Sequence, residues 1–581
     1  MAVTGGRGAR LRAILAEGDP ARAFITVMLA VMTLVTSIVI LMQFDASAAS
    51  ASAERQADAA ALERSEADAG GAGDQIIDYG MYRAWYEELE RANWAYQRAQ
   101  AVGGADASQP LLYALSQTDS QLADWVRSNS ALLQPPFFDP QTYAADFIGY
   151  VADRAAPSLR AGEHFDTANS VADQQESRSA LFVALLTVLA ASLFFLGLAA
   201  TISGLPQRVL IGAGLAFALV GTAGSAVLAV QPVHRVGDDA MEAVVHATAE
   251  AIQGAPNGSL AITDAQRTHA ETAIAAAAQA VALDPSYPGA WRSQGETNLA
   301  YASALYFSTA HPDVLPYVNR AIEGYRHVVE MGQPDYAVLW NLGWGLYVAG
   351  DLQGSLAATD AALKLAPDQF TLYLNRALAE LALGQTDTAR ASVETGLDTA
   401  ARSGLGSNGS FFAESDFDIG RLAELLPDQA TVLRQMLQRV REAEVSISIN
   451  GQALEAPSSG KVSIVSISPV ALQADGSLAA GAAVPDGATI PTTGTAGFRL
   501  TLSGAGVGGQ PVAVRVRRDG LIDNGYSQLW SWPAVDTVPV DLITPYGRAN
   551  FDANPGHYEI EVYLAGNLAA RVTLTVAAAT P

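Results

Sequence analysis

Side chains that could bind a metal or carry out acid–base chemistry are few in this sequence and widely spaced. No two of the seven histidines stand at the H-x-x-x-H interval that places two imidazoles on one helix face. The segment "AESDFDIG" offers Glu414, Asp416 and Asp418 as possible calcium ligands, but Ile419 occupies the position at which an EF-hand loop needs glycine. This segment is therefore better interpreted as the solvated start of a helix. We expect no metal site and no cofactor.

Nucleophilic chemistry has no support in the sequence either. The chain contains no cysteine, which excludes disulfides, thiol nucleophiles and zinc–thiolate sites. No G-x-S-x-G, Walker or dinucleotide-binding motif occurs in a suitable context. A pair of carboxylates that hydrolyses a glycosidic bond needs no fixed spacing, so an extracytoplasmic hydrolase stays open as an alternative. Our prediction is that the protein is not an enzyme.

The charge of the chain narrows its possible partners. The 581 residues include 34 basic and 59 acidic side chains, which gives a formal net charge of -25. Phosphate backbones repel such a surface, so we expect no nucleic-acid partner. Charged residues make up only 16% of the chain and apolar residues 50%, which favours membrane segments and alanine-rich helices. The lack of cysteine, with many alanines and glycines, favours a bacterial source.

Three apolar segments are long enough to cross a membrane as helices. Residues 23–44 begin with a long run without any charged side chain, and residues 180–230 hold two further apolar runs joined by the short loop "SGLPQR". Small residues in the last run, Gly212 and Gly221 among them, suit close packing against the run before it. The sequence therefore predicts one transmembrane helix followed by a transmembrane helical hairpin.

Basic residues set the expected orientation of these helices. Several arginines precede the first apolar segment and Arg208 lies in the hairpin loop, so both places are expected on the cytoplasmic side. Residues 1–22 then form a basic cytoplasmic tail, and most of the soluble mass, 45–179 and 231–581, lies outside the cell membrane. Residues 46–48 resemble a signal-peptidase site, which leaves cleavage of the first segment as an alternative.

Residues 45–179 are expected to form a small extracytoplasmic bundle of helices between the first two apolar segments. Tyr79, Tyr82, Tyr86 and Leu89 recur at helical spacing, and a glycine cluster before them is expected to break the preceding alanine-rich helix. The aromatic stripe fits the core of such a bundle, and stacking on a sugar or a base is the alternative. The helices that leave the first segment and enter the second must run in opposite directions.

A repeated pattern runs through residues 231–443. In "LWNLGWGLYVAGDLQGSLAATDAALKLAP" a small residue, Gly343, precedes Gly350, and the pattern recurs with Ala377 and Gly384. This pattern resembles the tetratricopeptide repeat, a helix–turn–helix unit that stacks into a superhelix. The resemblance implies an α-solenoid whose groove, lined by the first helix of each unit, holds a segment of a protein partner. The matching groove positions are Arg292, Glu296, Trp340, Trp344, Tyr347, Leu374 and Leu378.

Residues 444–581 contain short runs of alternating residues bounded by Gly, Pro, Asn or Asp, which predict an antiparallel β-sandwich. The first run is "VSISI" and the last is "ARVTLTV". The pattern resembles the immunoglobulin-like accessory modules of bacterial surface proteins. Trp530 and Trp532 share one face of a run. We expect them in the core, and contact with a carbohydrate or a partner is the alternative.

Together these features predict a multidomain α+β membrane protein with three transmembrane helices, an extracytoplasmic helical bundle, an α-solenoid and a C-terminal sandwich. The expected function is that of a membrane-anchored extracytoplasmic adaptor or scaffold, which binds protein partners through the repeat groove and contributes to the cell envelope. The alternative is an accessory subunit of a membrane sensor or transport complex that acts through residues 45–179 and the transmembrane hairpin.

Overall fold

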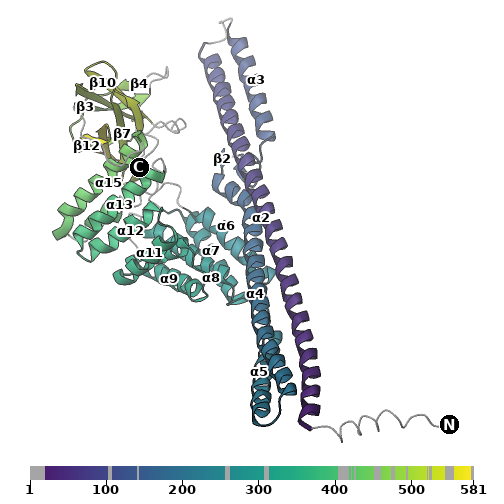
Figure 1. Ribbon diagram of the computed structural model, residues 1–581. Helices are drawn as coiled ribbons and strands as arrows, with labels where there is room; N and C mark the ends of the chain where they lie inside the picture. The colour runs from purple at the N-terminus through teal and green to yellow at the C-terminus, as the bar shows by residue number, and fades with distance from the viewer. Residues whose placement is uncertain are drawn as a thin grey trace. The chain divides into compact units, whose positions relative to one another are not determined.

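The computed structural model describes most of the chain, and helices dominate it (Figure 1). The described residues are 20–102, 108–140, 143–255, 262–306, 313–403, 418–420, 422–423, 427–450, 460–472, 478–492, 495–519, 521–522, 527–543 and 555–577. They fall into two compact units, and each is described by itself. The first unit ends at Thr297, inside helix α8 (Pro288–Tyr306), and the second unit begins at Asn298.

Helix α2 (Pro20–Val102) runs without interruption from the first apolar segment into the polar part of the first unit. The predicted break at the glycine cluster is wrong, because the helix continues through Gly70, Gly71 and Gly73. A Cβ atom at Gly71 would lie 3.0 Å from the carbonyl oxygen of Arg154 on helix α4 (Phe147–Thr201). Glycine therefore allows the two helices to approach closely here, and tertiary packing outweighs its poor helix propensity.

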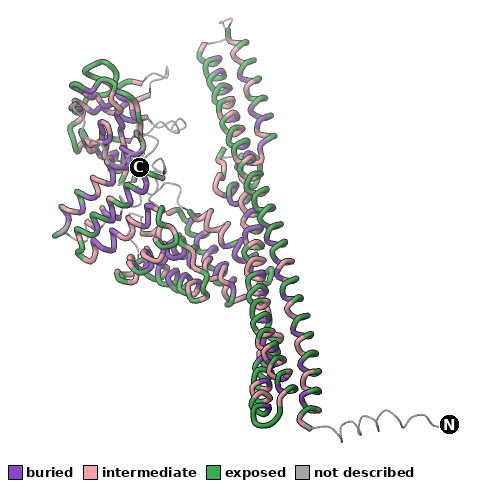
Figure 2. Tube along the Cα trace, in the orientation of Figure 1, coloured by how far each residue is buried: buried purple, intermediate pink, exposed green. Residues whose placement is uncertain are grey.

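Helices α2 and α4 pack side by side in opposite directions (Figure 1), and buried and exposed residues alternate along both (Figure 2). The buried side chains recur at intervals of seven residues. Two hydrogen bonds show the antiparallel direction, because the partner on α4 comes earlier as the residue on α2 comes later. The Gln43 amide donates to the Ser179 hydroxyl at 3.2 Å, and the Ser50 hydroxyl donates to the Ala172 carbonyl at 3.2 Å. A repeat of seven residues keeps the same face of each helix toward its partner over many turns. The buried positions are Ile25, Met32, Val39, Ala46, Ala53 and Ala60 on α2, and Ala161, Gln175, Phe182, Leu189 and Leu196 on α4.

Among the described residues, three helices are long and apolar enough to cross a membrane: α2, α4 and α5 (Leu205–Val230). Their apolar parts share one core, in which Met32 and Val39 pack with Phe182, Leu189 and Leu196. Glycines of α5 allow the close approach to α4 that the sequence predicts. A Cβ at Gly221 would lie 2.6 Å from the Leu189 side chain, whereas no described atom lies within 4 Å of one at Gly212. Only part of the predicted small-residue surface therefore makes this contact.

Helix α3 (Gln109–Ser128) folds back on the end of α2, and the two-residue strands β1 (Phe138–Asp139) and β2 (Ala144–Ala145) follow it. The core here centres on Trp85, which is 3% exposed and packs with Ala123, Val126 and Phe138. Of the predicted aromatic stripe, Tyr82, Tyr86 and Leu89 pack around this centre, whereas Tyr79 is exposed. The bundle interpretation of the stripe thus holds for most of its members, around a tryptophan that the prediction did not name.

A buried carboxylate joins the three helical elements of this region. Asp78 on α2 accepts hydrogen bonds from the Ser130 hydroxyl at 2.6 Å and from the backbone N–H of Ala131 at 3.0 Å. It also accepts one from the Tyr150 hydroxyl on α4. Because a carboxylate offers several acceptor sites, one side chain fixes the end of α3 and the start of α4 against α2.

A series of helices follows, in which α6 packs against α7, and each of the helices from α9 to α13 packs against the next. Gly350 and Gly384 have φ angles of 83° and 76°, which glycine adopts without strain, and each ends the turn between two helices. The predicted strand "VSISI" is wrong, because helix α15 includes it and buries Val445 and Ile447. The helices are α6 (Asp238–Gly254), α7 (Asp264–Leu283), α8, α9 (Leu315–Glu330), α10 (Tyr336–Val348), α11 (Leu352–Leu365), α12 (Phe370–Ala382), α13 (Thr386–Ser403), the 3-10 turn η2 (Pro427–Gln429) and α15 (Ala430–Asn450).

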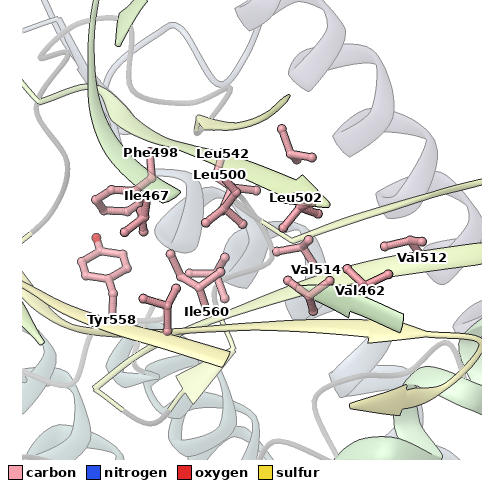
Figure 3. Close-up of a cluster of buried hydrophobic side chains, with 14 of the residues drawn as sticks. Val462, Ile467, Phe498, Leu500, Leu502, Val512, Val514, Leu542, Tyr558 and Ile560 are labelled. Atoms are coloured by element: carbon pink, nitrogen blue, oxygen red, sulfur yellow. The ribbon is translucent and has the colours of Figure 1, made fainter. Parts of the chain in front are cut away.

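Two β-sheets complete the second unit and enclose an apolar core (Figure 3). One sheet has the strand order β10-β6-β3-β4, and the other has the order β5-β12-β11-β7-β8 with β9 also paired to β7. All pairings are antiparallel except that of β12 with β5, which is parallel and departs from the predicted sandwich. The strands are β3 (Lys461–Leu472), β4 (Leu478–Ala480), β5 (Ala488–Pro491), β6 (Gly497–Ala505), β7 (Pro511–Arg518), β8 (Leu521–Ile522), β9 (Gln528–Ser531), β10 (Thr537–Ile543), β11 (Gly556–Leu564) and β12 (Asn567–Ala577).

The core between the sheets follows the alternation of the strands. Phe498 of β6 faces Tyr558 of β11, and Leu502 of β6 faces Val514 of β7 (Figure 3). Trp532 is 2% exposed in this core, and Trp530 packs against it, as the sequence predicts for both.

Candidate functional site

The aromatic residues expected in the repeat groove lie on α10 and keep part of their surface accessible. Trp340 and Trp344 are four residues apart, hence on one face of the helix, and both are partly buried. The Trp344 ring packs edge-on against Tyr306 of α8, with ring centroids 5.7 Å apart. We call Tyr306, Trp340 and Trp344 the aromatic ledge. Tyr306 was not predicted, although aromatic residues at the end of α8 could have suggested it.

The remaining groove positions in the second unit lie deeper. Tyr347 packs against the core formed by α12, α13 and α15. Burial above all, and then the nearby Asp418 carboxylate and Tyr306 hydroxyl, raise the pKa of Tyr347 far above its ordinary value, so its hydroxyl keeps its proton. Leu374 and Leu378 are each 2% exposed and belong to this core. These two leucines, predicted to line a groove, are therefore used for packing between helices and offer almost no exposed surface.

Local sequence explains why α10 and α11 hold the ledge in place. The Asp335 side chain accepts from the Val338 N–H at 2.8 Å and caps the start of α10, and Asp351 caps α11 in the same way through Gly354 at 3.0 Å. A Cβ at Gly343 would lie 2.7 Å from the Thr359 hydroxyl, so glycine is needed where α10 crosses α11. The backbone beneath Trp340 and Trp344 is thus fixed from both ends and from the side.

A polar pocket of about 470 Å³ lies between α9 and the end of α10. Its charged lining is partly self-paired: Arg326 lies 4.0 Å from Asp351, and His327 lies 3.4 Å from Glu330. Glu323 also lines it. This pocket was not predicted, although the sequence holds a signal for it. The polar residues Asn319, Glu323, Arg326, His327 and Glu330 recur along one face of α9.

Arg292 and Glu296, the groove positions in the first unit, face a helix of the same chain. The Tyr287 hydroxyl, just before α8, donates a hydrogen bond to the carboxylate of Glu163 on α4. Burial raises the pKa of Glu163 to about 7; the hydrogen bond from Tyr287 lowers it, Asp166 and Glu296 raise it, and Arg292 lowers it. The predicted residues Arg292 and Glu296 therefore form part of the electrostatic environment of Glu163.

Further polar contacts fix α4 to the helices that follow the third apolar segment. The Arg160 guanidinium donates to the Glu242 carboxylate of α6 at 2.5 and 3.1 Å. The backbone N–H of His234 donates to the Gln174 side chain at 3.0 Å, and the His234 ring lies 3.0 Å from Asp284 at the end of α7. We call this contact surface between α4 and residues 234–296 the stalk junction.

A buried ion cluster connects α15 to the sheet in the second unit. Glu561 of β11 is fully buried and accepts hydrogen bonds from Arg441 at 3.1 Å, Arg571 at 2.6 Å and the Tyr563 hydroxyl at 2.7 Å, and from Arg517 as well. Burial pushes the pKa of Glu561 upward, but Arg517 and Arg441 outweigh it and hold that pKa below its ordinary value. Since its members bond to one another inside the unit, we assign the cluster a structural role.

Metal chemistry gains no support from the side chains that the structure places together. Within the described ranges, no group of three His, Asp or Glu side chains lies close enough to hold an ion. Of the possible calcium ligands, Glu414 and Asp416 lie outside the described residues, whereas Asp418 is described and is 3% exposed.

Comparison with known proteins gives one short similarity. No family model matches the chain. A stretch of 65 residues is 46% identical to part of Protein FlbA of Caulobacter vibrioides (strain ATCC 19089 / CIP 103742 / CB 15). The match covers 11% of this chain and 11% of that protein. A likeness of this length assigns neither a family nor an activity to the chain.

Proposed function

We propose that this protein is a membrane-anchored scaffold that presents a helical repeat array and a β-sandwich to protein partners outside the cell membrane. The stalk junction carries the proposal. The ion pair between Arg160 and Glu242 and the hydrogen bond between Tyr287 and Glu163 attach the first repeat helices to α4, which continues into an apolar, membrane-length helix. An array built directly onto a membrane helix is suited to holding a partner at a fixed place.

The proposed orientation follows from charge. Arginines before α2 and Arg208 between α4 and α5 place these ends in the cytoplasm, so the polar parts of α2 and α4, the repeat helices and the sandwich lie outside. The antiparallel packing of α2 and α4 supports this arrangement, since it requires their apolar ends to lie at the same level.

We infer that the repeat helices are tetratricopeptide-like. Supporting this, Gly350 and Gly384 both occupy left-handed turns at equivalent places in two consecutive helix pairs. We likewise infer that the sandwich is an immunoglobulin-like accessory module. Its two facing sheets with a shared apolar core support the fold part of this inference.

The aromatic ledge is the proposed contact with a partner. Trp344 and Tyr306 form a partly exposed aromatic pair on a capped, rigid helix, and aromatic side chains of this kind dominate the energetics of protein interfaces. With Leu374 and Leu378 in the core, the surface open to a partner is smaller than the predicted groove. This aromatic surface favours the binding of an apolar or aromatic segment of the partner.

Site-directed photocrosslinking in native membranes tests the proposal. A photoreactive phenylalanine analogue is introduced at Trp344 of the full chain, and a matched control carries it at Leu365, which is 57% exposed on α11 of the same repeat pair. We expect a discrete crosslinked protein from position 344 that position 365 does not give, and we expect Trp340→Ala to reduce its yield. Identical products from both positions would exclude the ledge as the binding surface.

A further inference from the structure

Helix α3 uses only part of its surface to pack against α2. Its buried residues are Ser116, Ala123 and Val126. A second apolar face is left open to solvent, with Leu111 63%, Leu115 44%, Leu122 43% and Trp125 60% exposed. Four large apolar side chains along one exposed helical face are more than the scattered single residues that a soluble surface normally carries.

The spacing of this face indicates what kind of structure covers it. Leu111, Leu115, Thr118, Leu122 and Trp125, which we call the α3 stripe, alternate in steps of four and three residues. This is the a and d pattern of a coiled coil, in which each side chain inserts between four side chains of a facing helix. Thr118 donates its hydroxyl to the Ala114 carbonyl at 2.9 Å, so covering the stripe leaves no hydroxyl unsatisfied. The occupant that fits is another helix.

Charge indicates which helix it is. The chain carries a net charge of -25, so two copies repel each other over most of their surface. The α3 stripe is an exception, because its flanks hold Ala114, Gln121 and Ser128 on one side and Leu112, Asp119 and Val126 on the other. The nearby Asp124 is already paired with Arg127 at 3.2 Å. An almost neutral, heptad-spaced surface is self-complementary, as an interface related by a twofold axis requires.

We propose that the α3 stripe is a homodimer interface in which α3 of one copy pairs in parallel with α3 of a second copy in the same membrane. Copies inserted in one membrane share one orientation, so their α3 helices run in the same direction. In a parallel pair Leu115 meets the partner's Leu115, and Leu122 meets the partner's Leu122. Asp119 then lies beside the partner's Ala114, because the residue before an a position contacts the residue five places later on the other helix. No two carboxylates meet.

The lack of native cysteine allows a direct test with single-cysteine variants of the full chain. Leu115→Cys and Leu122→Cys place a thiol at the expected axis of the dimer, and Gln117→Cys places one on an exposed, off-stripe position of the same helix. Membranes are treated with a mild oxidant and the products separated without reductant. We expect both stripe variants to give a disulfide-linked dimer in a yield at least tenfold above that of Gln117→Cys.

A second measurement separates pairing from chance collision. The double variant Leu115→Glu with Leu122→Glu should lower the dimer fraction of the purified full chain in nanodiscs at least tenfold, whereas Gln117→Glu should leave it unchanged. Equal crosslinking at all three positions, or a dimer that survives both glutamates, overturns the proposal. Crosslinking at only one stripe position overturns the parallel register, and an adduct with a different protein assigns the stripe to another helical partner. The proposal rests on the proposed membrane anchoring and is independent of the aromatic ledge.

Discussion

The stalk junction should weaken as the pH rises, because of Glu163. Its pKa in the structure is about 7 against an ordinary value of 4.5, mainly through burial. When α4 and the repeat helices separate, the carboxyl returns to water and to its ordinary pKa. Between pH 4.5 and 7 the closed junction therefore binds more protons than the open one, and its stability falls as pH increases. Below pH 4.5 both states are protonated and the effect disappears.

The size of the effect follows from the same two values. A pKa raised from 4.5 to about 7 corresponds to a loss of about 3 kcal/mol of junction stability once the carboxyl is ionised. Glu163→Gln keeps the shape and an acceptor for the Tyr287 hydroxyl without the charge. The variant junction should match the parent at pH 4.5 and be more stable by about 3 kcal/mol at pH 8.

Hydrogen exchange of the α6 amides in the full chain, held in nanodiscs, measures this difference. Comparing parent and variant at the same pH cancels the intrinsic pH dependence of exchange and the titration of the groups that both proteins retain. The protection of α6 in the variant should exceed that in the parent by a factor that grows to more than a hundredfold between pH 4.5 and 8. Tyr287→Phe serves as a second probe, because losing its hydrogen bond should move the transition to higher pH. A ratio that is constant with pH would refute the reasoning.

Three further substitutions, one of them with a matched control, test the packing of the full chain by its unfolding in nanodiscs. Gly221→Val places its Cβ only 2.6 Å from the Leu189 side chain and should lower the free energy of unfolding by about 1–3 kcal/mol. The control Gly212→Val meets open space and should lower it by less than about 0.5 kcal/mol. Asp78→Ala leaves the hydroxyls of Ser130 and Tyr150 and the N–H of Ala131 without their acceptor. It should lower the stability of the first unit by about 3 kcal/mol or more, which faster hydrogen exchange of the α3 amides would show. Glu561→Gln leaves buried guanidinium groups without their counter-charge and should lower the stability of the sandwich by about 3–5 kcal/mol, and an unchanged melting temperature would contradict the role given to this cluster.

Periodicity predicted the elements whose pattern is local. The membrane-length helices, the repeat helices around Gly350 and Gly384 and most strands of the sandwich follow from runs of apolar or alternating residues. Where neighbouring structure overrides local preference, the prediction was wrong. "VSISI" alternates like a strand, but Val445 lies in α15, packed with Ala513 and Tyr563, so tertiary contacts decide its conformation.

Contacts with a neighbouring helix also explain why α2 is continuous although its local sequence favours a break. Its alanine-rich stretch shows no large apolar residues, and glycine favours a break, yet Ala46, Ala53 and Ala60 continue the seven-residue repeat of Met32 and Val39. Small residues bury little area individually, but they let two helices approach closely along their full length. This seven-residue repeat of alanines is present in the sequence, but the positions of large apolar side chains alone do not reveal it.

Single residues of the candidate site could be named from the sequence, whereas the way each of them packs could not. A family pattern assigns groove positions by analogy with arrays that stand alone, whereas this array begins beside a long helix of its own chain. Arg292 and Glu296 therefore contribute to the setting of Glu163, a residue more than a hundred positions away in sequence that no repeat pattern could connect to them. Leu374 and Leu378 are used by the core of the second unit. Of the predicted groove positions, Trp340 and Trp344 keep accessible aromatic surface, and the proposed partner binding should depend on them.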